Sequence, residues 1–205
     1  MNLNLESAAV NVSLFWLLTT PHEYAHAWTA TRLGDDTPRR QGRLTLNPLA
    51  HVDWIGTVIL PTVTSLLGGG FLGWGKPVST DPTRLRGGRN GLAAVALAGP
   101  GSNVVLAMLL AVVVRLAAGP APALADYAFR GVYLSLYLAL FNLIPVPPLD
   151  GSKLLLALRI PVVIYRELAQ FGFLFLVVAM TASDLGRWLA VLSLQGAQFL
   201  LSLVR

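Results

Sequence analysis

Two histidines and one glutamate stand in this sequence at the spacing that a catalytic metal ion requires. They belong to the run His22-Glu23-Tyr24-Ala25-His26. Residues four apart lie on one face of a helix, so His22 and His26 can hold the same metal ion. Glu23 lies beside them and can accept a proton from a water molecule that the metal activates. Because the chain has only three His in 205 residues, composition alone rarely produces this motif.

The segment around this motif is apolar enough to lie inside a membrane. Residues 10–20 carry no charge and lead directly into the motif. A charged side chain at the centre of a membrane helix costs about 2.5–3.5 kcal/mol, and polar groups at that depth usually serve a function. We therefore expect a first membrane helix over residues 7–33 that carries the His/Glu motif.

The composition is that of an integral membrane protein. Hydrophobic residues make up 55% of the chain and charged residues 12%, with a mean hydropathy of +0.64, whereas soluble domains carry roughly 25% charged residues. No polar stretch is long enough for a soluble domain, so we expect residues 1–205 to form one membrane-embedded, all-α domain. The absence of Cys excludes thiolate metal ligands. The N-terminal residues lack a basic region, which argues against a cleaved signal peptide.

Six apolar segments are candidates for about five or six membrane segments, each of which takes roughly 20 helical residues. The first four would form a three-helix catalytic core with one re-entrant or β segment, at about residues 7–158. The last two would form a C-terminal helical hairpin at about residues 165–205. Alternation at residues 42–46, within a polar stretch at 34–53, predicts a short strand. The six segments are residues 7–33, 54–75, 90–114, 131–149, 168–183 and 188–204.

The distribution of basic residues predicts the orientation. Basic residues flank membrane segments on the cytoplasmic side, so the helix over 7–33 should run from outside to inside. If residues 54–75 crossed the membrane, the basic stretch at 76–89 would lie outside. We therefore favour a re-entrant segment at 54–75, where Pro61 and the Gly68-Gly69-Gly70 triplet offer a place to turn. We attribute the net charge of +5 to this topology. Nucleic-acid binding is not expected, since no basic helix is present.

A third metal ligand must come from elsewhere, because a catalytic zinc site normally has three protein ligands and one open position. Asp150 stands out because it follows a long charge-free run and ends the series Asn142…Pro145…Pro147-Pro148-Leu149-Asp150. The prolines stop a regular helix, and Gly151 permits close approach of another group. A helix-ending turn with a solvated Asp150 fits the same spacing equally well. The other candidates are Asp35, Asp36, His51, Asp53, Asp81, Asp126 and Asp184.

Together these motifs resemble the site-2 protease family of intramembrane zinc metalloproteases. The resemblance rests on the run at residues 22–26, on Gly99-Pro100 followed by Asn103, and on the run at residues 142–151. The runs at residues 42–48 and 75–78 further resemble the compact prokaryotic branch of that family. The match covers roughly residues 21–151, and the chain has no PDZ or CBS module of the kind that larger members carry.

The resemblance implies a function and a role for each site residue. Zn²⁺ would be held by His22, His26 and Asp150, with Glu23 as the catalytic base, and Asn142 would contact the substrate backbone. The implied activity is hydrolysis of peptide bonds within or near transmembrane segments of membrane-protein substrates, as in regulated intramembrane proteolysis. The partners would be such a substrate and the lipid bilayer. The expected location is a prokaryotic plasma membrane, with the active site toward the cytoplasm.

Other features of the sequence have plainer explanations beside the functional ones. His51 more often serves as a structural hydrogen-bonding group than as a ligand. Asn103 follows small residues that favour close helix packing, and a part in positioning substrate is the alternative. A substrate helix must unwind before cleavage, and residues 43–46 could pair with the unwound stretch as a strand.

A second class of function is a non-enzymatic membrane protein with the same fold. It would be a catalytically inactive scaffold or a metal carrier. A transporter is expected to have two related halves with paired broken helices, and the sequence has no such symmetry. An inactive scaffold is expected to have lost Glu23 or a ligand, and all four residues are present.

Overall fold

The computed structural model describes residues 5–67 and 73–204, and within these ranges the chain is helical and has no β-strand. This confirms the all-α class that the composition predicts. The described elements are α1 (Leu5–Arg32), α2 (Thr37–Arg40), η1 (Pro48–His51), η2 (Trp54–Ile59), α3 (Leu60–Leu67), η3 (Pro82–Arg84), α4 (Arg89–Ala117), α5 (Pro122–Asn142), α6 (Gly151–Ala157), α7 (Val162–Ala182) and α8 (Leu185–Leu203).

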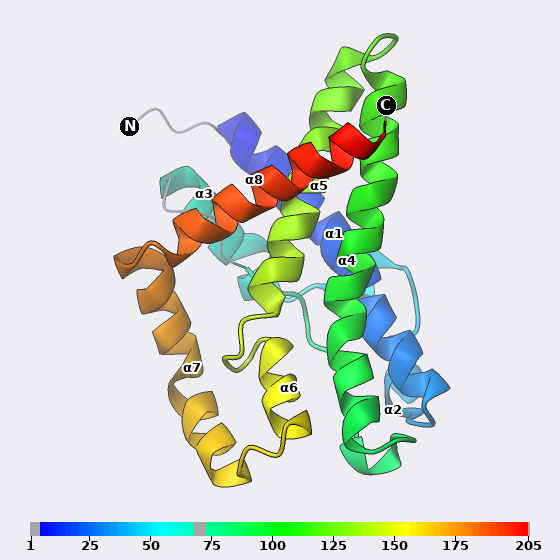
Figure 1. The fold of residues 1–205 in the computed structure, drawn as a ribbon, viewed down its shortest axis with the longest axis vertical. Coiled ribbons are helices and arrows are strands. Elements are labelled where there is room, and N and C mark those ends of the chain that lie inside the picture. Colours follow the sequence, from blue (N-terminus) through cyan, green and yellow to red (C-terminus); the bar gives the residue numbers. More distant parts are fainter. Residues whose placement is uncertain (1–4, 68–72, 205) are drawn as a thin grey trace.

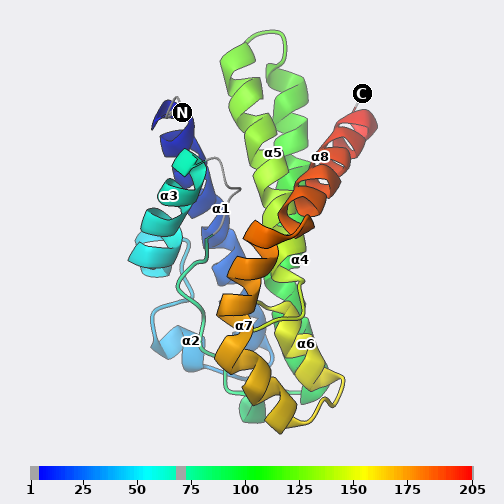
Figure 2. The ribbon, with the colours of Figure 1, turned by 90° about the vertical axis from the view of Figure 1, so that its left-hand side faces the viewer.

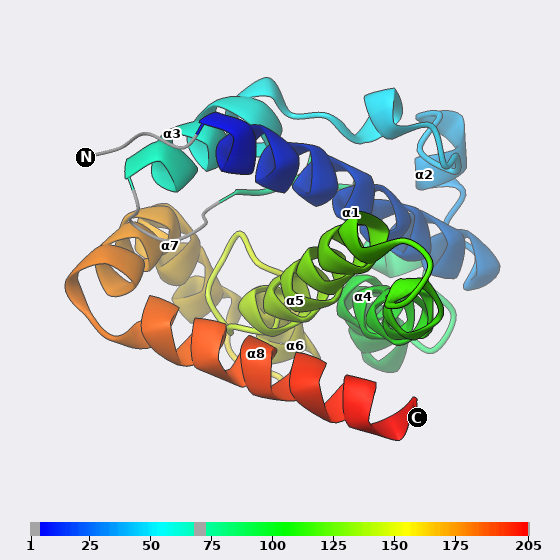
Figure 3. The same ribbon diagram turned by 90° about the horizontal axis from the view of Figure 1, so that it is seen from above.

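The core is a bundle of α1, α4 and α5. α4 and α5 are antiparallel neighbours joined by a short turn, and α1 lies against α4 (Figure 1, Figure 3). Phe15 and Leu18 of α1 are buried together with Leu134 and Leu138 of α5. This packing fixes the relative positions of the helix that carries the His/Glu motif and the helix that leads to Asp150.

The C-terminal helices α7 and α8 cover the two predicted segments, but α8 does not run back along α7 as the predicted hairpin would (Figure 1, Figure 2). α8 crosses α4 and α5, where Ala197 is buried against Ala107 and Ala111; small side chains allow such close approach between helices. α7 packs on α6 and on the end of α8 (Figure 2). The backbone of α7 at Gly172 lies close to the proline-rich loop. A Cβ at this position would lie 2.1 Å from the Pro147 carbonyl oxygen, so glycine permits the approach.

The loop that follows α5 turns the chain back sharply. α5 ends at Asn142, and three prolines in the next residues cannot donate the backbone hydrogen bonds of a helix. A Cβ at Gly151 would lie 2.2 Å from the Leu143 carbonyl oxygen, so only glycine permits this close return. The short helix α6, which the sequence did not predict, begins directly after Asp150.

The segment at 54–75 leaves the α2 side of the molecule and comes back to it. η2 and α3 run beside α1 (Figure 2). Trp74 N–H donates to the Gly56 carbonyl and Lys76 N–H to the His51 carbonyl, so residues 74 and 76 lie beside the start of the segment. Pro61 does not mark the turn, because it lies within continuous helix. The glycine triplet at 68–70 lies outside the described residues.

The strand expected at residues 42–46 is absent, and this prediction is wrong. A strand needs a neighbouring chain for its ladder, and no described segment pairs with these residues. Instead, Arg43 N–H donates to the Pro38 carbonyl and closes a turn after α2. The Arg43 side chain is buried and donates to the carbonyls of Ala50 and Lys76. The residue braces two other segments rather than forming a strand.

By length and composition, two of the described helices, α4 and α7, could cross a membrane. The surface around them is apolar. Phe171, Phe173, Leu174 and Phe175 of α7 are all exposed, although burial of such side chains from water is worth about 1.5–3 kcal/mol each. An apolar environment outside the bundle would remove that cost.

Candidate metal centre

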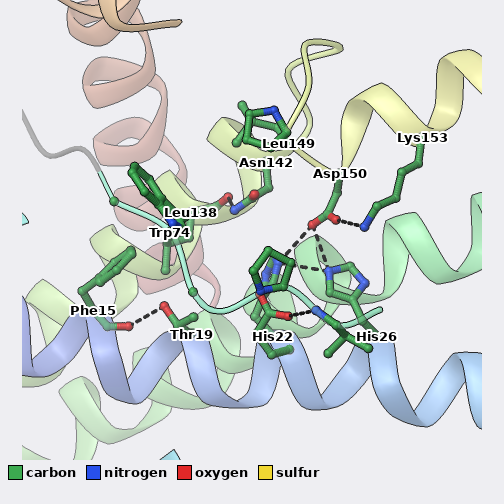
Figure 4. A pocket seen from close by; sticks show the side chains of 16 residues that line it. Phe15, Thr19, His22, His26, Trp74, Leu138, Asn142, Leu149, Asp150 and Lys153 are labelled. Atoms are coloured by element: carbon green, nitrogen blue, oxygen red, sulfur yellow. Dashed lines mark hydrogen bonds and ion pairs between the residues drawn. The ribbon is translucent and has the colours of Figure 1, made fainter. Parts of the chain in front are cut away.

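Three potential ligands from distant parts of the chain converge inside the bundle. His22 and His26 lie one turn apart on α1, and Asp150 lies at the start of α6 (Figure 4). The two Nε2 atoms are 3.1 Å apart, and Asp150 Oδ2 lies 3.1 Å from His22 Nε2 and 2.9 Å from His26 Nε2. All three side chains are buried. Among the described residues, no other group of three His, Cys, Asp or Glu residues meets the same geometric test.

The hydrogen bonding of His26 indicates that this cluster suits a metal ion. Its Nδ1 lies 2.7 Å from the Val95 carbonyl oxygen, which only accepts, so Nδ1 carries a proton. A metal ligand must be a neutral ring, and in that form the Nε2 lone pair would face the Asp150 carboxylate. Two acceptors at 2.9 Å repel each other unless a cation lies between them. Zinc bonds of 2.0–2.2 Å in a tetrahedron separate ligand atoms by roughly 3.3–3.6 Å, and two imidazoles with one carboxylate are common zinc ligands.

The second carboxylate oxygen of Asp150 is held by a lysine. Lys153 Nζ lies 2.8 Å from Asp150 Oδ1, one turn further along α6. The ion pair leaves Oδ2 to face the two histidines. The sequence signal for this contact was the three-residue spacing on a helix, which the sequence analysis did not use.

Glu23 lies next to the cluster but does not contact the histidines through a hydrogen bond. Its carboxylate is buried, and Oε2 accepts the Val78 N–H at 3.1 Å. The segment at 73–78 passes close over it, because a Cβ at Gly75 would lie 3.2 Å from Glu23 Oε1 and 2.4 Å from Thr19 Cγ2. Glycine at this position therefore lets the backbone reach the carboxylate.

A cavity of about 140 Å³ joins these residues. Glu23, the two histidines and Asp150 lie on its wall, together with Lys153 (Figure 4). The segment at 73–78 forms the opposite wall, where Trp74 also stacks edge-to-face on Phe173 of α7 at 5.5 Å. The remaining lining residues are Phe15, Thr19, Gly73, Gly75, Pro77, Val78, Leu138, Asn142, Pro148 and Leu149.

The two asparagines singled out in the sequence occupy different places. Asn142 lines the cavity, and its Nδ2 donates to the Leu138 carbonyl at 3.0 Å. Asn103 is fully buried on α4 and does not line the cavity. Its amide lies behind the cluster, where Nδ2 is 3.2 Å from His22 Nδ1. The sequence analysis weighed packing and substrate contact for Asn103 but not this contact with a ligand.

Six of the seven remaining candidate ligands have structural partners away from the cluster, and the seventh, Asp126, is exposed on α5. The His51 ring lies 2.8 Å from the Thr45 carbonyl, and burial lowers its pKa. Asp53 caps η2 by accepting the N–H groups of Ile55 and Gly56. Asp35 accepts two backbone N–H groups. Ion pairs with arginines three residues on hold Asp36, Asp81 and Asp184.

Comparison with known proteins identifies the family. The "Putative zinc metalloprotease YwhC" of Bacillus subtilis is 36% identical over 174 residues, which are 79% of this chain and 76% of the relative. This chain belongs to the site-2 protease family of zinc metalloproteases. The "Putative zinc metalloprotease Rip2" of Mycolicibacterium smegmatis is 38% identical over 180 residues, covering 84% of this chain and 67% of the relative. No family model and no solved structure matches the chain.

Family membership confirms the resemblance that the motifs indicated and the choice of zinc as cofactor. A shorter match, 41% identical over 61 residues, is the "Putative zinc metalloprotease MJ0611" of Methanocaldococcus jannaschii. The donor set of two imidazoles and one carboxylate agrees with the metal in these names. The assignment of each ligand to its residue stays a prediction, and the geometry above is what supports it.

Proposed function

We propose that this protein is an intramembrane zinc endopeptidase that hydrolyses peptide bonds within or near transmembrane segments of other membrane proteins. One observation carries the proposal. His22, His26 and Asp150 converge beside Glu23 on a cavity within a helical bundle whose outer surface is apolar. A water-consuming reaction at that depth needs such a cavity, because hydrocarbon holds no water.

The proposed setting is a bilayer crossed by α4, α7 and the other long helices as one domain, with the segment at 54–75 re-entrant. Three basic regions support the orientation, since α2, the start of α4 and the α6–α7 connection lie at the same end of the molecule (Figure 1). These regions contain Arg39, Arg40, Arg89 and Arg159. Basic residues favour the cytoplasmic side. The cavity would then open toward the cytoplasm of a prokaryotic cell.

Cysteine labelling tests this orientation without background, because the chain has no Cys. Single cysteines at positions 39, 76 and 120 would be treated with a membrane-impermeant reagent on intact cells. We expect labelling at 120 alone, and labelling at 39 and 76 only after the cells are opened. Labelling of 76 from outside would contradict the re-entrant path of residues 54–75.

The chemistry follows from the groups around the cavity. Zinc, when bound, lowers the pKa of water toward about 7 and polarises the substrate carbonyl. Glu23 accepts the proton of the attacking water and returns it to the leaving amine. The Val78 N–H fixes Oε2 of Glu23, which leaves Oε1 to exchange the proton. Lys153 keeps the Asp150 carboxylate in the orientation that faces both imidazoles.

The backbone at 73–78 is the proposed docking edge for an unwound substrate. The backbone N–H and C=O groups of Trp74 and Lys76 already form hydrogen bonds within the protein. Those of Trp74 bond Gly56 and Thr57, and those of Lys76 bond His51 and Arg43. Groups of alternate residues in an extended chain point the opposite way, so those of Gly73 and Gly75 would face the cavity that these residues line. A substrate strand could pair there. This edge replaces residues 43–46 as the proposed source of the strand.

The test is Glu23→Gln, which keeps the shape and removes the base. We expect zinc content equal to that of the parent and a fall in cleavage of about 10²–10⁴-fold, the usual contribution of a general base. Membrane-protein fragments would be compared by mass spectrometry in cells that express the parent or the variant. Glu167→Gln, at an exposed acid on α7, is the matched control and should cleave normally.

The same experiment separates an enzyme from an inactive or metal-carrying scaffold. Fragments that appear with the parent and disappear with E23Q indicate proteolysis by this site. Identical fragment sets in both strains, with zinc bound in both, would favour the scaffold.

A further inference from the structure

One face of α4 touches both histidines of the metal centre. Val95, Gly99 and Asn103 are spaced by four residues and so lie in a row on that face. The Val95 carbonyl lies 2.7 Å from His26 Nδ1, and the Asn103 amide lies 3.2 Å from His22 Nδ1. Between them, a Cβ at Gly99 would come within 2.3 Å of His26 Nε2 and 2.6 Å of His22 Nε2. Glycine at 99 therefore allows the two rings to lie against α4.

The Val95 carbonyl settles which nitrogen of His26 carries the proton, but His22 faces an amide that could either donate or accept. A metal ligand must offer a lone pair, so ligation through Nε2 requires the proton of neutral His22 to be on Nδ1. That proton needs an acceptor, and the Asn103 side chain is the group beside it. The O and N atoms of an amide have nearly the same shape, and the hydrogen-bond network decides their placement.

The lone pair that ligation needs on His22 Nε2 favours the reversed amide. With Nδ2 toward the ring, Asn103 Oδ1 is buried and has no hydrogen bond. That arrangement also places the ring proton on Nε2, where it would block the metal. Rotating the amide by half a turn gives Oδ1 the His22 Nδ1–H as its donor. It also gives both histidines the same pattern, with Nδ1–H bonded to an α4 oxygen and Nε2 free.

We propose that Asn103 is a positioning residue for the zinc ligand His22, and that its side-chain carbonyl accepts the His22 Nδ1–H. The proposal rests on the proposed metal centre. It assigns Asn103 to the metal rather than to substrate. Groups that hold ligating histidines in this way raise metal affinity or activity by about 10–100-fold. The neutral amide does so without adding a second buried carboxylate behind the ligand.

Zinc affinity of the purified protein is the first measurement, made by competition with a chelator and independent of any substrate. Asn103→Leu keeps the branching at Cγ and removes the acceptor, and we expect zinc affinity to fall by about 10–100-fold. Asn103→Asp restores an acceptor and should bind zinc within a few-fold of the parent. Ser135→Ala is the matched control, because it truncates another fully buried polar side chain in the bundle, and it should bind zinc like the parent.

The His22 Nδ1–H proton gives a second reading that packing alone would not change. In the zinc-loaded protein with ¹⁵N-labelled histidine, this proton should be hydrogen-bonded and slow to exchange with water. A carboxylate is the stronger acceptor, so N103D should shift its resonance downfield. N103L should shift it upfield and speed its exchange. If N103L does not fold, the shift of the His22 Nδ1–H resonance in N103D still tests whether Asn103 accepts this proton.

Two results would overturn the proposal. One is parent-level zinc affinity in N103L, and the other is a His22 Nδ1–H resonance that does not move in N103D. His22→Ala separates this failure from failure of the metal centre. If H22A loses zinc while N103L keeps it, only the role of Asn103 is wrong. If H22A also keeps zinc, the metal centre itself is wrong.

Discussion

The two walls of the cavity are built in opposite ways. The metal wall consists of the α1 side chains together with Asp150 and Lys153. Each proposed ligand has a supporting contact, from Val95, Asn103 or Lys153. The opposite wall is the backbone at 73–78, where Trp74 and Lys76 bond away from the cavity and the Val78 N–H bonds Glu23. Under the proposed function, the metal wall would be fixed before substrate arrives, and the other wall would offer backbone hydrogen-bonding groups to the substrate chain.

The largest expected effect is loss of the metal wall through Asp150→Ala. The change removes one ligand and leaves Lys153 without its ion-pair partner. We expect zinc affinity to fall by more than the about 100-fold that supporting groups reach, with loss of all cleavage. Metal content after dialysis against a chelator measures it. Asp184→Ala, at an exposed acid paired with Arg187, should keep its zinc, and a D150A protein that also kept its zinc would refute the ligand assignment.

An intermediate effect is expected from Arg43→Leu, which loosens the opposite wall. The buried guanidinium bridges the carbonyls of Ala50 and Lys76, and a buried acceptor without a partner costs about 1–3 kcal/mol. We expect cleavage to fall by about tenfold, equivalent to roughly 1.4 kcal/mol, while zinc content stays at the parent level. Arg40→Leu, at an exposed position on α2, is the control. Loss of zinc in R43L would mean that the two walls are not independent.

A change at Asp35, which lies in neither wall of the cavity, should have the smallest effect on zinc binding and cleavage. Its carboxylate accepts the N–H groups of Thr37 at 2.9 Å and Asp81 at 2.7 Å. Burial raises the pKa of Asp35, but these hydrogen bonds outweigh that effect, and the pKa lies below its ordinary value of 3.8. The stabilisation is therefore complete above pH 3.8 and is lost as pH falls through the lowered pKa.

Asp35→Asn should lower stability at neutral pH by about 1–3 kcal/mol, because one of the two N–H groups loses its acceptor. It should also remove this acid-dependent loss of stability, as thermal unfolding at several pH values would measure. Zinc content and cleavage at 25 °C should not change. Asp36→Asn, next to it but exposed and 3.7 Å from Arg39, should unfold like the parent. Equal stability of D35N and D36N would contradict the role of Asp35.

The contacts that the sequence predicted well are local ones. The four-residue spacing of His22 and His26 fixes their shared face once a helix forms, and three prolines fix where α5 must end. The long apolar segments predicted α1, α4, α7 and α8 to within a few residues at most ends. These predictions need only the geometry of one element and its preference for an apolar environment.

The predictions that failed were those that depended on contacts with another segment of the chain. Residues 42–46 alternate as a strand would, but no described segment lies alongside them, and the buried Arg43 side chain turns to two carbonyls instead. Pro61 was expected to turn the chain, yet it lies inside helix. The carbonyl of Gly56, five residues earlier, accepts the Trp74 N–H.

The sequence by itself determined that a paired-histidine motif lies in an apolar helix and that Asp150 stands on a proline-broken turn. Helix periodicity and proline geometry act over a few residues, so they can be read directly from the chain. Only the tertiary structure decided that Asp150 meets the histidines, that α4 supports both rings and that residues 73–78 cover Glu23. Those contacts join residues 55 to 128 positions apart. They depend on how α1, α4 and α5 pack, which no local pattern encodes.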